Sequence, residues 1–205
     1  MERTPVIAAL AMTLAVTATG CSGAQPSADK CQKVSAPLSD VPSRTDQEPK
    51  LRVPVPAGWE RTTEMDNQDI RFAIRNKGLA ADGFTPNAVV TLQKVPSDLG
   101  RPEQILAAQN EQIAKALKVD NMNTKETEVC GVPAVSTSYT VPEAKISPKI
   151  PTIPPRSATS LGAVYRTGDT NYVAMLTVQS VKPDEKTFAA DAEMILNGFQ
   201  LLPPN

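Results

Sequence analysis

Beyond residue 50 the chain alternates apolar and polar residues in short segments, which stretches rich in glycine and proline separate. Alternation with a period of two is typical of strands that bury one face of a sheet. Tight turns join two consecutive pairs closely enough for hairpins. The pattern predicts an edge strand followed by six further strands, mostly antiparallel, at residues 51–55, 70–75, 88–95, 126–133, 134–141, 161–166 and 172–178.

Two segments change to the spacing of an amphipathic helix. In residues 101–117 apolar or long side chains recur at every fourth position, and Pro102 occupies a favourable first helical position. A second helix is expected over residues 183–197, with Gly198 at its end. Two main helices packed on a mostly antiparallel sheet of about seven strands make an α+β domain.

The first twenty residues have the pattern of a secretion signal. Arg3 precedes a continuous apolar run at residues 6–16, and small residues follow up to Cys21. The run is shorter than the roughly 20 apolar residues that a transmembrane helix needs, so residues 1–20 are expected to be a cleaved signal peptide. No other apolar run of the sequence approaches membrane length, and any membrane attachment is therefore expected through Cys21.

Cys21 stands where a bacterial lipobox has its acylated cysteine. Ala18 occupies the position three before it, where such boxes usually carry Leu, Val or Ile, and Glu2 lies beside Arg3. Lipidation of Cys21 is the leading interpretation; plain secretion with cleavage nearby and an uncleaved anchor are the alternatives. Two or three acyl chains would anchor the protein stably, because each buried CH₂ contributes about 0.8 kcal/mol. The expected location is extracytoplasmic, on the cell membrane.

Residues 21–49 are polar and contain few large apolar side chains. Such a composition cannot bury a core, so this segment is expected to be a tether that follows the lipidated cysteine. Residues 50–205 remain as a single globular domain, expected to be monomeric. The net charge of −1 favours neither nucleic acid nor an electrostatic attraction to membranes.

The chain contains no histidine. This excludes Ser-His-Asp and Cys-His catalysis and every histidine metal ligand. No glycine-rich phosphate loop is present. A lysine-assisted serine at Ser136 or Ser138 stays open, but no Ser-x-x-Lys spacing supports it. We therefore expect no enzyme, no cofactor and no metal.

Cys31 and Cys130 remain if Cys21 carries lipid. An extracytoplasmic compartment is oxidising, so a structural disulfide between these two cysteines is expected, and a nucleophilic role is the weaker alternative. The disulfide would attach the tether to the domain.

Several short motifs, taken together and in order, resemble the mycobacterial LpqN/LpqT lipoprotein family. After the signal peptide and Cys21 these are VPVPAGW at 53–59, GFTPNAVV at 83–90, GVPA at 131–134 and ILNGF at 195–199. The resemblance covers residues 51–202 and implies a PsbP-like α/β/α sandwich with a role in the cell envelope. It also implies binding of trehalose mycolates and contact with the periplasmic parts of the transporters that export them. It supplies no catalytic motif.

Six aromatic side chains are candidates for an apolar ligand cleft, although aromatic residues make up only 4 % of the chain and most are expected in the core. They are Trp59, Phe72, Phe84, Tyr139, Tyr165 and Tyr172.

Residues 142–156 contain five prolines, which favour an extended conformation and oppose pairing in a sheet. This segment is expected to be either a long loop packed on the domain or a flap that contacts a lipid or a partner. The leading hypothesis is a non-enzymatic envelope lipoprotein that binds a lipid or glycolipid and assists its transport. The alternative is a membrane-anchored adaptor that binds a protein partner through residues 142–156.

Overall fold

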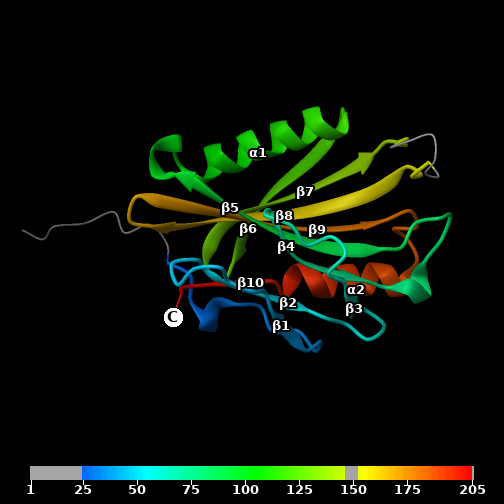
Figure 1. The fold of residues 1–205 in the computed structure, drawn as a ribbon, viewed down its shortest axis with the longest axis horizontal. Coiled ribbons are helices and arrows are strands. Elements are labelled where there is room, and N and C mark those ends of the chain that lie inside the picture. The colour runs from blue at the N-terminus through cyan, green and yellow to red at the C-terminus, as the bar shows by residue number, and fades with distance from the viewer. Residues whose placement is uncertain (1–24, 146–151, 205) are drawn as a thin grey trace, which may run out of the picture.

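The structure, a computed structural model, describes residues 25–145 and 152–204. Its elements form three layers (Figure 1). The middle layer is an antiparallel sheet with the strands in the order β3 (Glu60–Arg61), β4 (Ile70–Arg75), β5 (Asn87–Pro96), β9 (Thr170–Ser180), β8 (Arg156–Thr167), β7 (Val132–Val141) and β6 (Met122–Val129).

Helices cover both faces of this large sheet. Helix α1 (Pro102–Leu117) lies on β7 and β8, and helix α2 (Lys186–Asn197) lies on the opposite face (Figure 1). A small sheet beside α2 contains β1 (Leu38–Asp40), β2 (Lys50–Pro54) and β10 (Gln200–Leu202). The short 3-10 helices are η1 (Ala28–Lys30), η2 (Lys77–Leu79) and η3 (Ser97–Leu99). The expected α+β class is confirmed.

The hydrophobic pattern located both helices within a few residues. Gln104 accepts a hydrogen bond from the backbone N–H of Arg101 at 2.9 Å and thereby caps the start of α1. The carboxylate of Glu185 accepts one from the backbone N–H of Phe188 at 2.8 Å and caps α2, which ends at Gly198 as expected. Each helix begins where a side chain satisfies an otherwise unpaired backbone donor.

Six of the seven predicted strands belong to the large sheet. Strand β9 pairs along nearly its whole length with β5 on one side and with β8 on the other. The hairpin of β6 and β7 turns at Cys130 and Gly131, whose φ angles are 50° and 86°. Two successive positive φ angles are the requirement of a two-residue turn that matches the twist of the strands.

The face of the large sheet toward α2 is apolar. Successive side chains of a strand point to opposite faces of the sheet. Alternate residues of the central strands therefore point into this layer, and they are almost wholly buried. The core there includes Ala88, Val90, Leu92, Leu161, Ala163, Ala174, Leu176, Val178, Ile195, Phe199 and Leu201.

The seventh predicted strand corrects the expected topology. Residues 51–55 were expected at an edge, but β2 is the central strand of the small sheet, with β1 and β10 on either side. Leu51 pairs with Leu201, so the start and the end of the domain meet here. Strands β1, β3 and β10 are only two or three residues long, which is too short to produce a recognisable alternation.

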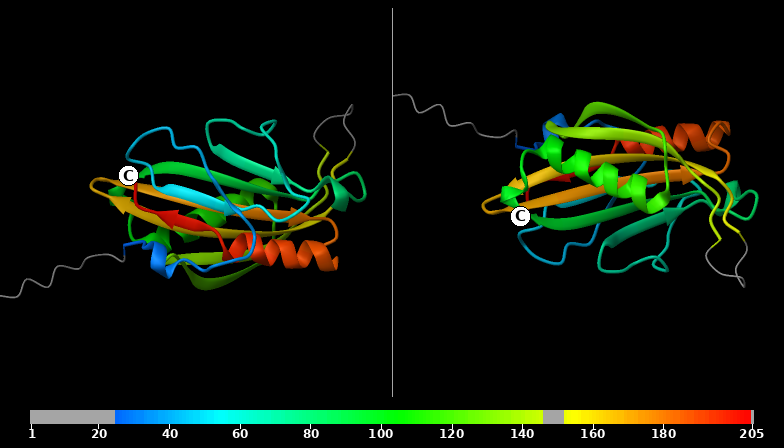
Figure 2. Two further views of the ribbon diagram at one scale, coloured as in Figure 1. Left: turned by 90° about the horizontal axis from the view of Figure 1, so that it is seen from below. Right: turned by 90° about the horizontal axis from the view of Figure 1, so that it is seen from above.

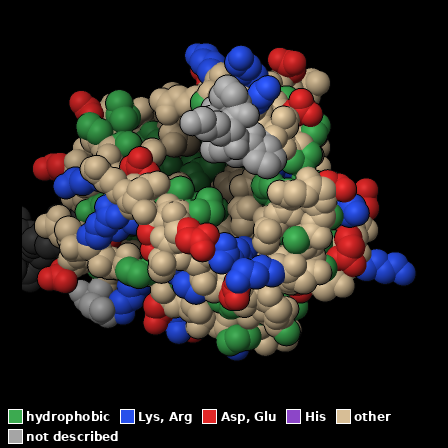
Figure 3. Space-filling view, turned by 45° about the vertical axis from the view of Figure 1, so that its right-hand side comes forward, with side chains coloured by type: hydrophobic (Ala, Val, Ile, Leu, Met, Phe, Trp, Pro, Cys, Tyr) green, Lys and Arg blue, Asp and Glu red, His purple; other side chains and the backbone are tan. Residues whose placement is uncertain are grey.

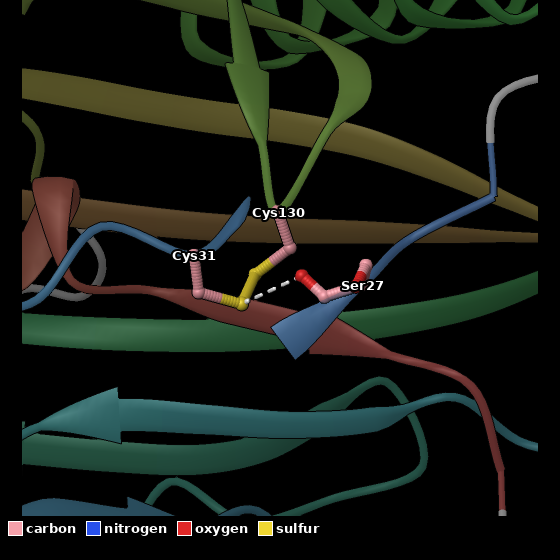
Figure 4. The surroundings of a disulfide bond; sticks show 3 residues. All are labelled: Ser27, Cys31 and Cys130. Carbon is pink, nitrogen blue, oxygen red and sulfur yellow. Dashed lines mark hydrogen bonds between the residues drawn. A yellow bond between two sulfur atoms is a disulfide. The ribbon is translucent and has the colours of Figure 1, made fainter. Parts of the chain in front are cut away.

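The expectation of a polar tether over residues 21–49 is corrected for its described part. The backbone N–H of Ser27 donates to the carbonyl oxygen of Cys130 at 3.0 Å, and that of Val41 donates to Leu51 at 2.9 Å. The expected disulfide joins Cys31 to Cys130 beside Ser27 (Figure 4). A segment too polar to form a core is thus held by a covalent link and by backbone pairing with the domain.

A buried ion pair holds the end of this segment. The carboxylate of Glu48 accepts hydrogen bonds from both terminal nitrogens of Arg71, at 2.6 and 3.1 Å, and from the backbone N–H of Arg44 at 2.8 Å. The side chains of Glu48 and Arg71 are only 7 % and 8 % exposed. Burial alone would raise the pKa of Glu48, but these hydrogen bonds and the charge of Arg71 hold it below its ordinary value.

Part of the proline-rich segment, residues 142–156, pairs its backbone with a neighbouring strand, although its prolines were expected to oppose such pairing. Ala144 and Ile153 exchange two backbone hydrogen bonds, of 3.0 and 2.9 Å, between the ends of β7 and β8. The described part of residues 142–156 therefore extends the β7–β8 hairpin, and residues 146–151 lie outside the described residues.

Within the described ranges no helix is long and apolar enough to cross a membrane.

The disulfide should contribute measurably to stability. It closes a loop of 99 residues, and removal of a native disulfide from a small secreted domain typically costs about 2–5 kcal/mol. We expect the Cys31→Ser, Cys130→Ser double variant to lose that much free energy of unfolding in urea titrations. Reduction of the wild type should reproduce the loss, whereas dithiothreitol should leave the double variant unchanged. Equal stability of oxidised and reduced wild type would contradict the role of this bond.

The Glu48–Arg71 pair should make stability depend on pH. Because the pKa of Glu48 is lower in the folded state, the pair stabilises the fold above the ordinary value of 4.5 and loses this effect as the pH falls through the lower folded value. We expect Glu48→Gln to cost about 3 kcal/mol at pH 7 and less below pH 4.5, as measured by urea unfolding. Asp40→Asn removes an exposed partner of Arg52 and should change stability by less than about 1 kcal/mol. A constant loss for Glu48→Gln at every pH would refute this assignment.

Candidate functional site

Four of the six aromatic candidates lie in the apolar core. Trp59, Phe72, Tyr165 and Tyr172 are buried between the large sheet and the layer of α2. The indole N–H of Trp59 donates to Asp191 of α2 at 2.8 Å, so its polar atom is satisfied. Burial also raises the pKa of Tyr165. The packing of these four side chains accounts for their presence without a ligand.

The other two aromatic candidates lie outside that core. Tyr139 is buried under the end of α1 beside Val119 and Val141. Phe84 is half-buried in the connection before β5. The structure therefore separates the six residues into two groups, and a ligand role stays a prediction for all of them.

The two faces of the large sheet differ in how they are covered. On β5 the residues facing α2 are apolar and buried, whereas Asn87, Thr91 and Gln93, on the opposite face, are polar and half-buried. Figure 2 shows the reason: α1 lies over β7 and β8, while β5 and β4 run beside it. Helix α1 reaches β5 through the hydrogen bond that Gln109 donates to Gln93 at 3.0 Å. The α1 face therefore offers polar groups and free surface on one rigid sheet.

Hydroxyl groups form a network beneath α1. Asn110 of α1 donates to the hydroxyl of Thr137 at 2.9 Å. The hydroxyl of Ser160 lies 3.0 Å from that of Tyr139 and 2.8 Å from that of Thr177. These bonds connect α1 to β7 and link the neighbouring strands β7, β8 and β9. The buried hydroxyl groups of this network are thus satisfied by one another, as buried polar groups generally are.

A cleft of about 600 Å³ lies between the first half of α1 and strands β6 and β7. This is within the usual range for small-molecule sites. Leu106 and Val135 contribute apolar surface, and Ala107 and Asn110 line it from α1. A neighbouring cavity of about 340 Å³ shares Pro102, Glu103 and Pro133 with the cleft.

The neighbouring cavity reaches the N-terminal segment. Gln25 and Pro26 line it together with Tyr165, the aromatic candidate found there. The sequence did not predict the cleft. The apolar positions of α1 that face the sheet were predicted, but they do not show that the small side chain of Ala107 leaves space between the helix and the strands. A gap that a small side chain leaves unfilled becomes visible only when the packing of the helix on the sheet is known.

A second cavity, of about 490 Å³, lies on the other face, near the disulfide. Charged side chains, among them Lys30, Lys125, Glu128 and Glu193, line much of it. The cleft beside α1 has the more apolar lining and is the better candidate for an apolar ligand.

The sequence of residues 33–202 matches the family model Lpp-LpqN, described as "Probable lipoprotein LpqN". The chain belongs to this family. The resemblance noted in the short motifs is thereby confirmed, and membership supports a lipoprotein of the cell envelope. A search of the curated proteins finds no match.

The fold of the chain is similar to that of a solved structure of LpqN. LpqN of Mycobacterium tuberculosis, described as involved in cell envelope biogenesis, is similar with a TM-score of 0.58 and 17 % identity, over 82 % of this chain and 91 % of that one. Mog1p of Saccharomyces cerevisiae, a Ran-binding protein, has a TM-score of 0.47 and 13 % identity over 82 % of this chain and 97 % of its own. At these identities the likeness concerns the fold alone.

Proposed function

We propose that this Lpp-LpqN protein is a non-enzymatic envelope lipoprotein that binds a lipid or glycolipid, such as a trehalose mycolate, in the cleft beside α1. The observation that carries the proposal is the cleft of about 600 Å³ with apolar side chains from α1 and β7. A preformed, mostly apolar concavity with a few polar groups is the usual form of a small-ligand site. Leu106 and Val135 would contact an acyl chain, and Asn110 would orient its polar head.

The position of the cleft supports a ligand that comes from the membrane. Gln25, which lines the neighbouring cavity, follows Cys21 by four residues, and an extended chain spans at most about 3.5 Å per residue. A lipid on Cys21 would hold that cavity within about 15 Å of the anchor. The protein would then receive lipid at the membrane and assist its transport, in contact with the periplasmic part of a lipid transporter. It would act as a monomer.

Filling the cleft should weaken binding of the ligand. Ala107 and Ala108 are neighbouring exposed residues of α1, but Ala107 lines the cleft and Ala108 does not. We expect Ala107→Trp to weaken binding of a trehalose monoester of palmitic acid by at least about tenfold, because the indole occupies the apolar space. Isothermal titration calorimetry of the mature protein measures this loss.

The matched control is Ala108→Trp, which adds the same side chain to the same helix and should bind the ester like the wild type. Equal binding by both variants would show that the cleft is not the site. Failure of the wild type to bind this ester, free trehalose mycolates or membrane lipids would overturn the proposed function.

The anchor can be tested separately. Cys21 lies outside the described residues, and its lipidation is part of this proposal. Cys21→Ser should move the protein from the membrane fraction to the soluble extracytoplasmic fraction, because the acyl chains provide the binding energy. Phase partition in a non-ionic detergent measures the change, and Cys31→Ser, which keeps Cys21, should remain with the detergent. Retention of Cys21→Ser in the detergent phase would exclude this residue as the anchor.

A further inference from the structure

One half-buried arginine differs from all the others. Among the described residues, five arginines are half-buried. Four of them have a carboxylate partner: Arg52 pairs with Asp40, Arg61 with Asp66, Arg71 with Glu48, and Arg75 with Glu60 and Glu64. The fifth, Arg156, makes no ion pair with any described residue, and its Nη1 is buried without a hydrogen-bond partner.

Neighbouring strands hold the Arg156 guanidinium in place. Its Nε donates to Gln179 on β9 at 2.6 Å, and the amide of Gln179 donates to Asn87 on β5 at 2.9 Å. Its central carbon lies 5.5 Å from the centre of the Phe84 ring. One edge of the guanidinium is therefore fixed by a hydrogen-bonded chain and one face by an aromatic ring, while a terminal nitrogen remains unused.

This arrangement has an energetic cost that a ligand could remove. Burial lowers the pKa of Arg156, although the charge that Tyr139 carries when ionised would oppose this effect. A partly buried cation without an anion is unfavourable, because the bond to Gln179 and the contact with Phe84 replace only part of the water that it has lost. A planar guanidinium is suited to hold a carboxylate or phosphate through two parallel hydrogen bonds.

The surroundings of Arg156 are partly apolar and open. Arg156 pairs with Val141 at the end of the sheet opposite Cys130, on the face that α1 covers only in part. The molecule is hollowed at this end, and hydrophobic side chains lie in the depth of the hollow (Figure 3). Phe84 contributes a ring beside the cation. An anionic group attached to an apolar group matches both parts of this surface better than a free anion does.

We infer that Arg156, held by Gln179 and Phe84, is a second ligand site that binds the carboxylate or phosphate of an acidic amphiphile at the end of the sheet opposite Cys130. A small turn of the side chain brings the buried Nη1 of Arg156 to the surface. There it donates a hydrogen bond to the anion, and the apolar part of the ligand lies in the hollow. This site is separate from the cleft of the proposed function, which Ala107 lines at the first half of α1.

Calorimetry with matched ligands tests this site. The probes are dodecanoate, dodecyl phosphate and dodecanol, all below their aggregation limits, with acetate and inorganic phosphate as anions without a chain. We expect the two acidic amphiphiles to bind the mature wild type at least about tenfold more tightly than dodecanol and than either free anion.

Variants then assign the binding to Arg156. Arg156→Gln should remove the advantage of the acidic amphiphiles over dodecanol, and Arg156→Lys should keep a reduced preference because it retains the charge without the planar fork. Arg52→Gln, on the small sheet, is the matched control and should bind like the wild type. Far-ultraviolet circular dichroism checks the folding of each variant. If Arg156→Gln does not fold, the Lys variant and the ligand series decide the question.

Three results with the wild type and Arg156→Gln would overturn the inference, and a fourth, with Ala107→Trp, would do the same. The three are equal wild-type binding of dodecanol and dodecanoate, an unchanged acid preference in folded Arg156→Gln, and acetate or phosphate binding as tightly as the amphiphiles. If Ala107→Trp no longer binds the acidic amphiphiles while Arg156→Gln binds them like the wild type, the acid binds in the cleft. This result would likewise refute the site at Arg156. None of these outcomes bears on the binding of the neutral trehalose ester, so the two proposals fail independently.

Discussion

The apolar packing of the large sheet against α2 and the small sheet is the interaction on which the rest of the structure depends. Strands β5, β9 and β8 contribute alternating residues that are almost wholly buried, and β2 and β10 close the layer from the far side. Each Å² of apolar surface removed from water contributes about 25 cal/mol. The polar N-terminal segment adds little to this burial and is held by the disulfide and the Glu48–Arg71 pair, whose partners the sheet positions.

The same sheet has a different role on its other face. Helix α1 covers β7 and β8 and also packs on Val173 and Met175 of β9. Beyond them β5 presents the polar, half-buried residues Asn87, Thr91 and Gln93. Because the α2 side supplies a closed apolar core, the α1 side can leave a cleft and a partly covered surface without loss of the fold. Sites built on strands and helices hold their geometry better than sites on loops. This division between a closed face and an open face supports ligand binding on the α1 side.

The two proposed sites lie at opposite ends of this open face. The cavity beside the cleft reaches Gln25, close in sequence to the proposed anchor, and Arg156 lies at the other end of β8. Neither proposal requires a reactive group, in agreement with a chain that contains no histidine. Both would use interactions that the fold prepares in advance: an unfilled apolar space in one case and an unpaired cation in the other.

The sequence alone determined the two helices and six strands of the large sheet, because these follow from periodicity and turn residues that are local. It also determined the disulfide pair, because only Cys31 and Cys130 remain beside Cys21, and the family, because its short motifs occur in order along the chain. Only the tertiary structure decided that β2 is a central strand and that residues 25–49 pack on the domain. It alone also decided that four aromatic candidates lie in the core on the α2 side and two lie outside it. It also decided the cleft beside Ala107 and the isolation of Arg156 from every described carboxylate. These features depend on which residues, distant in sequence, become neighbours, and on what space remains between them, and neither can be read from a pattern along the chain.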